Sequence, residues 1–229
     1  MARFFSSPVQ GIVKSIAALP MPDADIARAA PTKALQPRTK LMNAPRIAAP
    51  LLRDATPADF PAIAAIYAHH VLYGAASFEE TPPAQDELLR RHAAVCEHGL
   101  PWLVAEIDGR VAGYCYATPY RPRAAYRYTI EDSIYIDEAF RGRGLGRTLL
   151  EALIARCEAG PWRQMIAVVA DPKGGSLALH ESLGFELVGT LRSVGFKHDA
   201  WRDTTLMQRA LGEGQRTLPE ATAHKSARH

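Results

Sequence analysis

The sequence predicts an α/β (α+β) fold, in which about four helices flank a mixed central sheet of about six to seven strands. Stretches with helical spacing of apolar residues alternate along the chain with short apolar or alternating runs typical of strands. Asp108-Gly109 between two alternating runs is the strongest short signal for a hairpin, so two neighbouring strands are expected to be antiparallel. A glycine-rich loop that follows a strand-like run opens a helix, which indicates a strand–loop–helix unit in the same domain.

The composition is ordinary for a globular protein. Of the 229 residues, 48% are hydrophobic and 22% are charged, enough for one domain with a sizeable core plus extensions. The net charge of +3 is too small to argue for a nucleic-acid partner, and no apolar run is long enough to span a bilayer. We therefore expect neither nucleic acid nor a membrane as a partner.

The cysteines favour a reducing, cytoplasmic setting. Cys96, Cys115 and Cys157 form no CxxC pair, and an odd number is a poor disulfide framework. Cys115 and Cys157 lie within apolar patterns, so buried thiols are expected. No histidine that could act as a base lies beside either one in sequence, so neither is expected to act as a nucleophile.

The chain is expected to divide into three parts. Residues 1–49 are rich in Ala and Pro and lack periodicity, so they are expected to be a disordered or linker-like extension. A targeting peptide is the alternative, but Lys14 interrupts the apolar patch and Asp23 and Asp25 spoil an acid-poor signal. Residues 50–212 form the folded domain, and 213–229 are expected to be a disordered tail.

The first half of the domain begins with a short strand (APLLRDA) and a helix (TPADFPAIAAIYAHHVLYG). Thr56 can cap this helix, Pro57 suits its first position, and Asp59 faces the exposed N–H groups. The loop SFEETPPAQ leads to a second helix, DELLRRHAAVCEHG, which Gly99 closes.

The hairpin PWLVAEIDGRVAGYCYATPY comes next, followed by the strand YRYTIEDSIYID, in which Ile130, Ile134 and Ile136 share one face. The glycine-rich loop opens the helix RTLLEALIARCEAG, which carries one apolar stripe. A buried strand (QMIAVVAD), a short helix (SLALHESLGF) and two final strands (ELVGTLRSVGFKHDAWRDTTLMQRAL) complete the domain.

The stretch RGRGLG is a candidate phosphate site, because glycines let backbone N–H groups approach a ligand and a helix N-terminus attracts anions. A Walker A loop needs GxxxxGK[ST], and here Gly142 is followed by Gly146 too early. A dinucleotide fingerprint needs GxGxxG, but position 147 is Arg. The coenzyme A pyrophosphate loop of acetyltransferases, [RQ]xxGxG/A, is matched by Arg141, Gly144 and Gly146. A glycine turn that only caps the helix is the remaining alternative.

The segments SFEETPP, YATPYRPRAAYRYTIEDSIYID, RGRGLG, LALHESLGF and GFKHDAWRDTTLMQ resemble the GNAT superfamily of N-acetyltransferases. Within it, the chain looks like the phosphinothricin and methionine sulfoximine acetyltransferases, from Leu51 to about Leu211. The resemblance implies the GNAT fold, acetyl-CoA as donor, and the α-amino group of phosphinothricin, methionine sulfoximine or methionine sulfone as acceptor. It also implies herbicide or antibiotic resistance, and a homodimer with the final strands as contacts.

By resemblance, backbone N–H groups near Ile134 to Ile136 stabilise the charge on the thioester carbonyl. The expected coenzyme contacts are Ser133, Ile134, Tyr135, Ile136, Arg141, Gly142, Arg143, Gly144, Leu145, Gly146, Arg147 and Lys173. The family usually has Asn three residues before Ser176, where this chain has Lys173. Lys cannot accept a hydrogen bond, so a contact between Lys173 and a coenzyme phosphate is expected instead.

Two residues are catalytic candidates. Attack on a thioester needs a neutral amine, and Glu131 lies mid-strand on the face opposite Ile130 and Ile134, where apolar neighbours should raise its pKa to suit a base. It matches the family's catalytic glutamate; pairing with Arg127 is the alternative. His180 matches the family's His in LHE and could relay a proton or orient the substrate. A helix histidine bonded to a neighbour is its alternative.

The acceptor is expected to meet Arg121, Arg123 and Tyr126, because a bidentate Arg suits a carboxylate. Phe78 and Glu79 would line the same pocket from the other side. A solvated basic loop is the alternative for each arginine. No metal is expected, since the adjacent His69 and His70 would point to different faces of a helix.

Two other functions remain open. Acetylation of another small amine or of a protein N-terminus is one, although the arginine-rich stretch argues against cationic acceptors. A non-catalytic acyl-CoA-binding regulatory module is the other, and Lys173 is the feature that favours it.

Overall fold

The computed structural model describes residues 49–170 and 175–219. In this part the strands are β1 (Leu51–Asp54), β2 (Trp102–Ile107), β3 (Arg110–Pro119), β4 (Thr129–Ile136), β5 (Gln164–Val169), β6 (Glu186–Lys197) and β7 (Ala200–Ala210). The α-helices are α1 (Phe60–Tyr73), α2 (Gln85–Glu97), α3 (Leu145–Glu158) and α4 (Ser176–Ser182). Short 3-10 helices are η1 (Pro57–Asp59), η2 (Ala124–Tyr126) and η3 (Glu138–Phe140).

The elements confirm the predicted fold class. The element order and the helix and strand types follow the sequence prediction, with α1 preceded by the short 3-10 turn η1. Residues 1–48, 171–174 and 220–229 lie outside the described residues, so the division of the chain into extension, domain and tail stays a prediction. In the described ranges, no helix is long and apolar enough to cross a membrane.

The strands form one mixed sheet in the order β1-β2-β3-β4-β5-β7-β6. β4 and β5 run parallel, and the other neighbouring pairs are antiparallel. The predicted hairpin turn is present between β2 and β3, where Asp108 and Gly109 both have positive φ, +50° and +75°. A second such turn, at His198 and Asp199, joins β6 to β7. Local turn chemistry therefore sets the pairing next to each turn, and the register shifts farther along, at Ala105/Glu106 in β2 and at Leu187/Gly189 and Leu191/Gly195 in β6.

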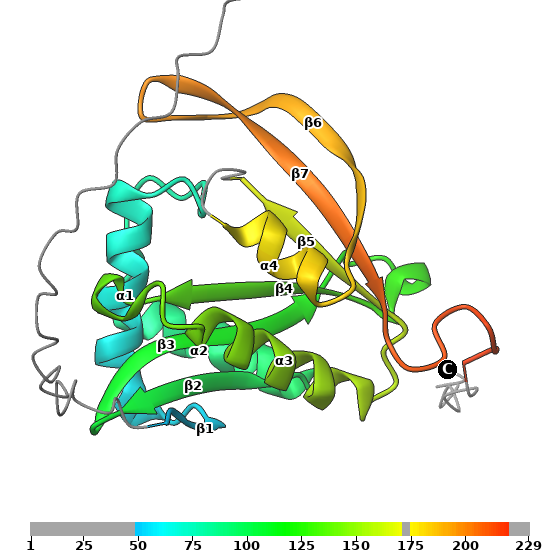
Figure 1. The fold of residues 1–229 in the computed structure, drawn as a ribbon, viewed down its shortest axis with the longest axis horizontal. Coiled ribbons are helices and arrows are strands. Elements are labelled where there is room, and N and C mark those ends of the chain that lie inside the picture. Colours follow the sequence, from blue (N-terminus) through cyan, green and yellow to red (C-terminus); the bar gives the residue numbers. More distant parts are fainter. Residues whose placement is uncertain (1–48, 171–174, 220–229) are drawn as a thin grey trace, which may run out of the picture. The chain divides into compact units, whose positions relative to one another are not determined.

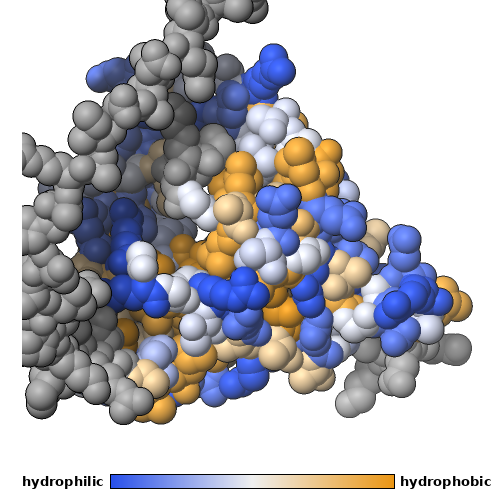
Figure 2. Space-filling model, viewed as in Figure 1, coloured by the Kyte–Doolittle hydropathy of each residue, from blue (hydrophilic) through white to orange (hydrophobic). Residues whose placement is uncertain are grey.

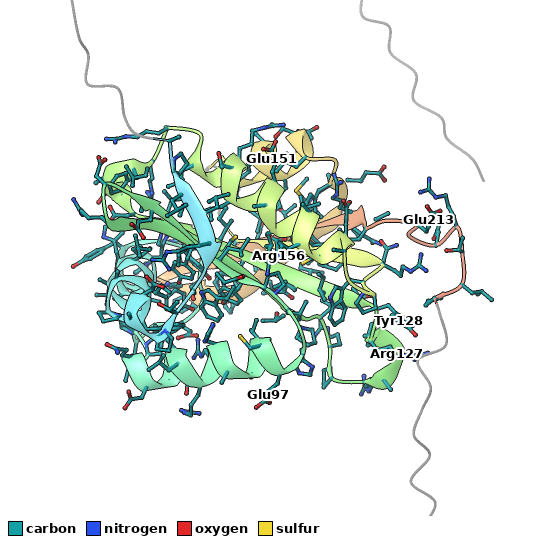
Figure 3. The ribbon with its side chains drawn as sticks, turned by 90° about the horizontal axis from the view of Figure 1, so that it is seen from below. Glu97, Arg127, Tyr128, Glu151, Arg156 and Glu213 are labelled. Atoms are coloured by element: carbon teal, nitrogen blue, oxygen red, sulfur yellow. The ribbon has the colours of Figure 1, made fainter. Side chains whose placement is uncertain are left out.

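Helices cover the two faces of the sheet (Figure 1). In the view from below, α2 with Glu97 lies on one side of the strands, and α3 with Glu151 and Arg156 lies on the other (Figure 3). α1 packs beside α2, and its Tyr67 meets Tyr135 of β4 edge to face at 5.0 Å. α4 lies on the α3 side, where Leu179 approaches Gly146. The two helical layers make the two faces of β4 chemically different.

The core fills both sides of the central strands. Fully buried side chains include Ile130, Leu149 and Met165, each 0% exposed. Burying a large apolar side chain stabilises a fold by roughly 1.5–3 kcal/mol. This packing holds β3, β4 and β5 as the rigid base on which the site is built.

Candidate active site

The sheet opens beside β4. β4 pairs with β5 only from Thr129↔Gln164 to Glu131↔Ile166, while it continues as a strand to Ile136. Past Glu131, β4 therefore has β3 on one edge and no paired strand on the other among the described residues. The wedge between the diverging strands begins next to Glu131 and Asp132.

The open edge of β4 presents backbone groups from alternate residues. Asp137 donates its N–H to Ala112 O at 3.0 Å, and Tyr120 donates to Thr129 O at 3.1 Å, so the odd-numbered residues hydrogen-bond β3. Successive residues of a strand point their N–H groups to opposite edges. The N–H groups of Ile134 and Ile136 consequently face the wedge. Those of Ser133 and Tyr135, which were also predicted to contact the coenzyme, face β3.

Glu131 lies on the α1–α2 side of β4, half-buried. Its carboxylate has no hydrogen bond or ion pair with any described residue. Arg127, the alternative partner, instead donates to Ala124 O at 3.0 Å and lies over the Tyr128 ring. Burial raises the pKa of Glu131, the charge of Asp132 adds to this, and Arg121 partly offsets it. Within the described part of the chain, Glu131 is thus an unpaired carboxylate with a raised pKa at the edge of the wedge.

His180 lies on the opposite side of β4, where it meets Asp132. Its Nε2 is 3.0 Å from Asp132 Oδ2, and its Nδ1 is 2.7 Å from Ser176 O. The residues His180 and Asp132 are 2% and 7% exposed. The Phe185 ring packs edge-on against the imidazole at 4.9 Å. Glu131 and His180, the two predicted catalytic residues, thus lie on opposite faces of β4.

The predicted phosphate loop combines two kinds of glycine. Gly142 and Gly144 have φ of +72° and +78°, which side-chain-bearing residues rarely adopt. Gly146 is needed for a different reason, because a Cβ there would lie 3.3 Å from the Leu179 side chain of α4. Leu145 begins α3, so the first N–H groups of the helix face this loop. The loop therefore has the open donors of an anion site.

The three arginines of the loop differ in their contacts. Arg143 lies over the Phe140 ring at 5.3 Å, and Arg141 is exposed. Arg147 is bound by two protein partners: it donates to Ser182 Oγ at 2.9 Å and pairs with Glu151 at 2.8 Å. Arg141 and Arg143 form no ion pair with the described residues, so they are better placed than Arg147 for an added phosphate. The predicted contact Lys173 lies outside the described residues.

The arginine-rich segment before β4 is exposed and ordered by aromatic contacts. Arg121 lies over the Tyr120 ring at 4.9 Å, and Tyr126 meets the same ring edge to face at 5.8 Å. Arg123 is exposed at the start of η2. Arg121 also acts electrostatically on Glu131. Arg121 and Tyr126 thus share one small aromatic cluster beside the predicted base.

The segment after α1 meets the β6–β7 hairpin. A Cβ at Gly195 would clash with the Phe78 ring, which packs there. Glu79 pairs with Arg91 of α2 at 2.7 Å. Lys197 is 2% exposed, and its Nζ donates to Ser77 O at 2.6 Å. Burial lowers the pKa of Lys197.

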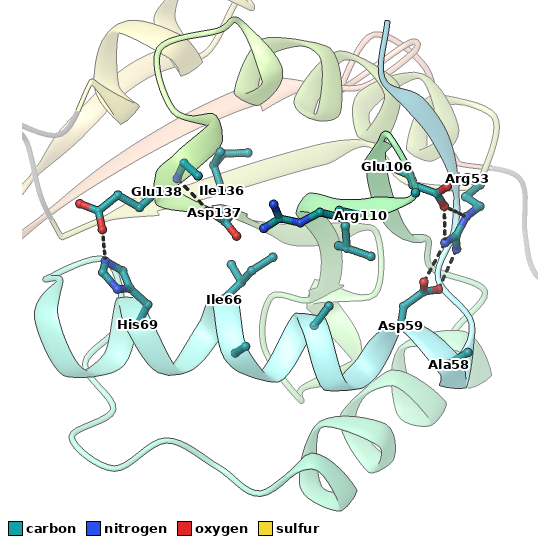
Figure 4. A pocket seen from close by; sticks show the side chains of 15 residues that line it. Arg53, Ala58, Asp59, Ile66, His69, Glu106, Arg110, Ile136, Asp137 and Glu138 are labelled. Atoms are coloured by element: carbon teal, nitrogen blue, oxygen red, sulfur yellow. Dashed lines mark hydrogen bonds and ion pairs between the residues drawn. The ribbon is translucent and has the colours of Figure 1, made fainter. Parts of the chain in front are cut away.

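A depression of about 840 Å³ lies elsewhere, between α1, the β2–β3 turn and η3 (Figure 4). Arg110 points into it, and Arg53 pairs with Asp59 and Glu106 at one end. Of the predicted site residues it includes Ile136 alone.

Among residues 49–170 and 175–219, no cluster of three side chains could hold a metal ion. His69 pairs with Glu138 and His70 with Ile136 O.

Asp132 and Lys197 were not predicted from the sequence. A signal for Asp132 was present, because it is a charged residue on the apolar face of the strand between Ile130 and Ile134. No such signal pointed to Lys197, whose burial depends on a segment 120 residues away.

Comparisons with known proteins agree with this geometry. The sequence model of the acetyltransferase (GNAT) family matches residues 64–185. A phosphinothricin N-acetyltransferase of Alcaligenes faecalis is 60% identical over 163 residues, which cover 71% of this chain and 83% of that protein. An L-methionine sulfoximine/L-methionine sulfone acetyltransferase of Pseudomonas aeruginosa is 40% identical over 161 residues, covering 69% and 92%.

A solved structure is also similar over most of its length. It is a GNAT superfamily phosphinothricin acetyltransferase from Sinorhizobium meliloti in complex with AcCoA. The two superpose with a TM-score of 0.74 at 46% sequence identity, covering 78% of this chain and 97% of that one.

Proposed function

The chain belongs to the acetyltransferase (GNAT) family and is an acetyl-CoA-dependent acyltransferase; from this premise we propose its acceptor and its site residues. The proposed acceptor is the α-amino group of a small amino-acid-like molecule, namely phosphinothricin, methionine sulfoximine or methionine sulfone. These are the substrates named for relatives that are 60% and 40% identical. The transfer is direct, with Glu131 as general base.

The half-buried Glu131 at the edge of the wedge, whose carboxylate has no ion pair or hydrogen bond with the described residues, carries this proposal. An amino acid's amine is mostly protonated near neutrality, and it attacks a thioester only after losing a proton. Because burial raises the pKa of Glu131, its carboxylate is a stronger base than an exposed one. The N–H groups of Ile134 and Ile136 point into the same wedge and would stabilise the developing oxyanion, each by roughly 3 kcal/mol.

The loop before α3 fits the coenzyme's pyrophosphate. The first N–H groups of α3 are free to bind an anion, and Gly142 and Gly144, both with positive φ, leave room for it because they have no Cβ. Arg141 and Arg143 add charge and form no ion pair with the described residues, whereas Arg147 supports the loop through Ser182. When bound, the coenzyme supplies the activated acetyl group. Lys173 remains a proposed contact.

Arg121, Arg123 and Tyr126 are the proposed contacts for the acceptor's carboxylate. Arg121 and Tyr126 share the Tyr120 ring, which limits their freedom and reduces the entropy lost on binding. Phe78 and Glu79 are proposed to line the far side of the pocket. Glu79 is already paired with Arg91, so its charge is partly neutralised toward an anionic substrate.

The thiols support direct transfer, since neither buried cysteine is a usable nucleophile. Burial raises the pKa of Cys157 to about 12 and raises the pKa of Cys115 well above its ordinary value. Both side chains are also 0% exposed. An acetyl-cysteine intermediate on either residue is therefore disfavoured.

We further propose that the chain works as a cytoplasmic homodimer and confers resistance to an amino-acid-like herbicide or antibiotic. The proposed contact surface is the β6–β7 hairpin, whose large apolar side chains are open to solvent. The exposed set is Leu187, Val188, Leu191, Val194, Phe196 and Trp201.

An acceptor screen tests the proposed function. The protein is mixed with acetyl-CoA and phosphinothricin, methionine sulfoximine, methionine sulfone, unmodified amino acids, small amines or an N-terminal peptide, and thiol release is followed. We expect release with the first three and little with the amines. Release only with amines or the peptide would replace the acceptor class. Tight acetyl-CoA binding with no release on any acceptor would indicate a binding module.

A further inference from the structure

The contact between Asp132 and His180 is a polar pair that is almost completely buried. The side chains are 2% and 3% exposed, and the hydrogen-bonded atoms lie 3.0 Å apart. The residues come from different elements, β4 and α4, 48 positions apart in sequence. A buried carboxylate and imidazole are costly to desolvate unless they bond each other, so this pair is held in one geometry.

Both nitrogens of the His180 ring face hydrogen-bond acceptors. Nδ1 lies 2.7 Å from the Ser176 carbonyl oxygen, which can only accept, so Nδ1 carries a proton. Nε2 faces Asp132 Oδ2, and the proton between them belongs to the pair as a whole. The ring therefore has no free lone pair with which to take a proton from a substrate. This geometry is unsuited to a general base.

The groups around His180 favour the protonated form of its imidazole ring. Burial by itself lowers the pKa of His180, but the hydrogen bond and charge of Asp132 and the Ser176 carbonyl together raise it. Asp132 also acts on Glu131 from its own strand, on Cys115 of β3 and on Cys157 of α3. The Phe185 ring covers the imidazole. Within the described residues, no Lys or Arg pairs with the carboxylate.

We propose that Asp132 is a positioning residue for His180: its carboxylate holds Nε2 as a donor while the Ser176 carbonyl oxygen holds Nδ1, so that His180 enters the reaction as a proton donor and the role of base is left to Glu131. The inference rests on the proposed function for the reaction, but the pair itself is a property of the folded chain. Asp132 is the first residue of β4 beyond its last pair with β5, so the proton is held at the apex of the wedge.

The two faces of β4 carry out the two proton transfers that the reaction needs. The amine nitrogen forms a bond to the acetyl carbon, the carbon–sulfur bond breaks, and the electron pair leaves on sulfur. Glu131, on the α1–α2 side, takes the proton that the amine loses. The Asp132–His180 pair, on the α4 side, supplies the proton that the sulfur gains. Exchange with solvent restores both groups before the next turnover.

The protonation state of His180 can be measured without any turnover. Imidazole ¹⁵N–¹H correlation spectra are recorded from about pH 5 to about pH 9, and His180 is assigned from the signal lost in His180→Gln. In the native protein we expect both His180 N–H groups to persist above the ordinary histidine pKa of about 6.5. In Asp132→Asn the amide can donate to Nε2, so the pKa of His180 should fall and one N–H should disappear near neutrality.

Kinetics give the second readout. Asp132→Asn should lower kcat on the order of 10²-fold, with a smaller change in KM, and move the alkaline limb of the pH–rate profile to lower pH. In a His180→Gln background the same substitution should lower kcat no further, because the effects of residues that act through one another are not additive. A purely structural role would lower stability without moving the pH profile.

Asp59→Asn is the matched control, since it removes the charge of another buried, ion-paired carboxylate, whose partners are Arg53 and Thr56. It should lower stability but leave the His180 spectra and the pH profile unchanged. An ordinary His180 pKa in the native protein overturns the proposal, even if Asp132→Asn does not fold. Additive losses in the double variant overturn it as well. Because the spectra need no substrate, a failed acceptor screen leaves this test intact.

Discussion

Glu131 and Asp132 are adjacent carboxylates with opposite surroundings. The strand turns Glu131 toward α1 and α2, where it has no hydrogen-bonding partner among the described residues. It turns Asp132 toward α4, where His180 binds it. Since neighbouring side chains of a strand point to opposite faces, one backbone segment can hold two acids in separate environments. Their proximity still matters, because the charge of Asp132 adds to the burial that raises the pKa of Glu131.

Glu131→Gln tests the base. The substitution keeps shape and polarity but removes the basic oxygen, so kcat should fall by roughly 10²–10⁴-fold in the thiol-release assay. In the native protein the activity should fall as pH decreases through a pKa above the ordinary glutamate value of about 4.3. Glu158→Gln, an exposed carboxylate paired with Arg209, is the control and should keep full activity. Native turnover in Glu131→Gln would remove this role from Glu131.

At the scale of elements, the start of α1 is fixed by one buried carboxylate. Asp59 accepts the Thr56 N–H at 2.7 Å and the Thr56 hydroxyl at 2.9 Å. Arg53 of β1 binds both oxygens of Asp59 at 2.7 Å and also reaches Glu106 of β2 (Figure 4). This cluster ties β1, α1 and β2 together, so it holds the helix that covers the Glu131 face of the sheet.

Asp59→Asn should destabilise the fold in a pH-dependent way. The hydrogen bond from Arg53 lowers the pKa of Asp59 to about 2, below its value of 3.8 in an unfolded chain. The shift corresponds to about 2 kcal/mol of stability. A lowered pKa stabilises the folded state above pH 4, and this contribution is lost as pH falls from about 4 toward about 2.

Urea unfolding at pH 7 and at about pH 3 measures this contribution. The difference between the native protein and Asp59→Asn should be largest at pH 7 and about half as large at pH 3. Asp54→Asn is the control on the same strand: its ion pair with Arg156 is exposed and should contribute little. An equal loss in both variants, or a loss independent of pH, would contradict the assignment.

At the scale of the whole molecule, the β6–β7 hairpin exposes large apolar side chains that the described part of the chain does not cover. Nearly every side chain of β6 is at least partly open to solvent, and Leu187 and Trp201 are both 67% exposed. Figure 2 shows apolar residues open to solvent beside polar ones on the face where the hairpin lies. β6 is also the edge strand of the sheet. Exposed apolar side chains on an edge strand are typical of a surface that pairs with another chain.

The proposed dimer predicts a mass of two chains. Light scattering coupled to gel filtration should give twice the 25.0 kDa of one chain. Trp201→Glu places a charge on the hairpin and should shift the mass to that of one chain. Leu51→Glu is the control, because Leu51 is 57% exposed on the opposite edge strand, and it should leave the mass unchanged. A native mass of one chain would contradict the dimer.

The element order followed from the sequence because its signals are local. Apolar periodicity marked the helices and strands, and Asp108-Gly109 marked a turn that the structure contains. The predicted roles of site residues rested on residue chemistry together with resemblance, and the structure adds their geometry. Ile134 and Ile136 present N–H groups to the wedge, whereas Ser133 and Tyr135 present theirs to β3. Which edge of a strand stays unpaired depends on its neighbours, so no local pattern reveals it.

The sequence by itself determined which segments become helices, strands and turns, and which family they belong to, because those properties depend on residues close together in the chain. The tertiary structure alone decided that Asp132 meets His180 and that Lys197 meets Ser77, across 48 and 120 positions. Such contacts depend on strand order and on where β4 separates from β5. These are set by the packing of the whole sheet, which brings together side chains that no local pattern connects.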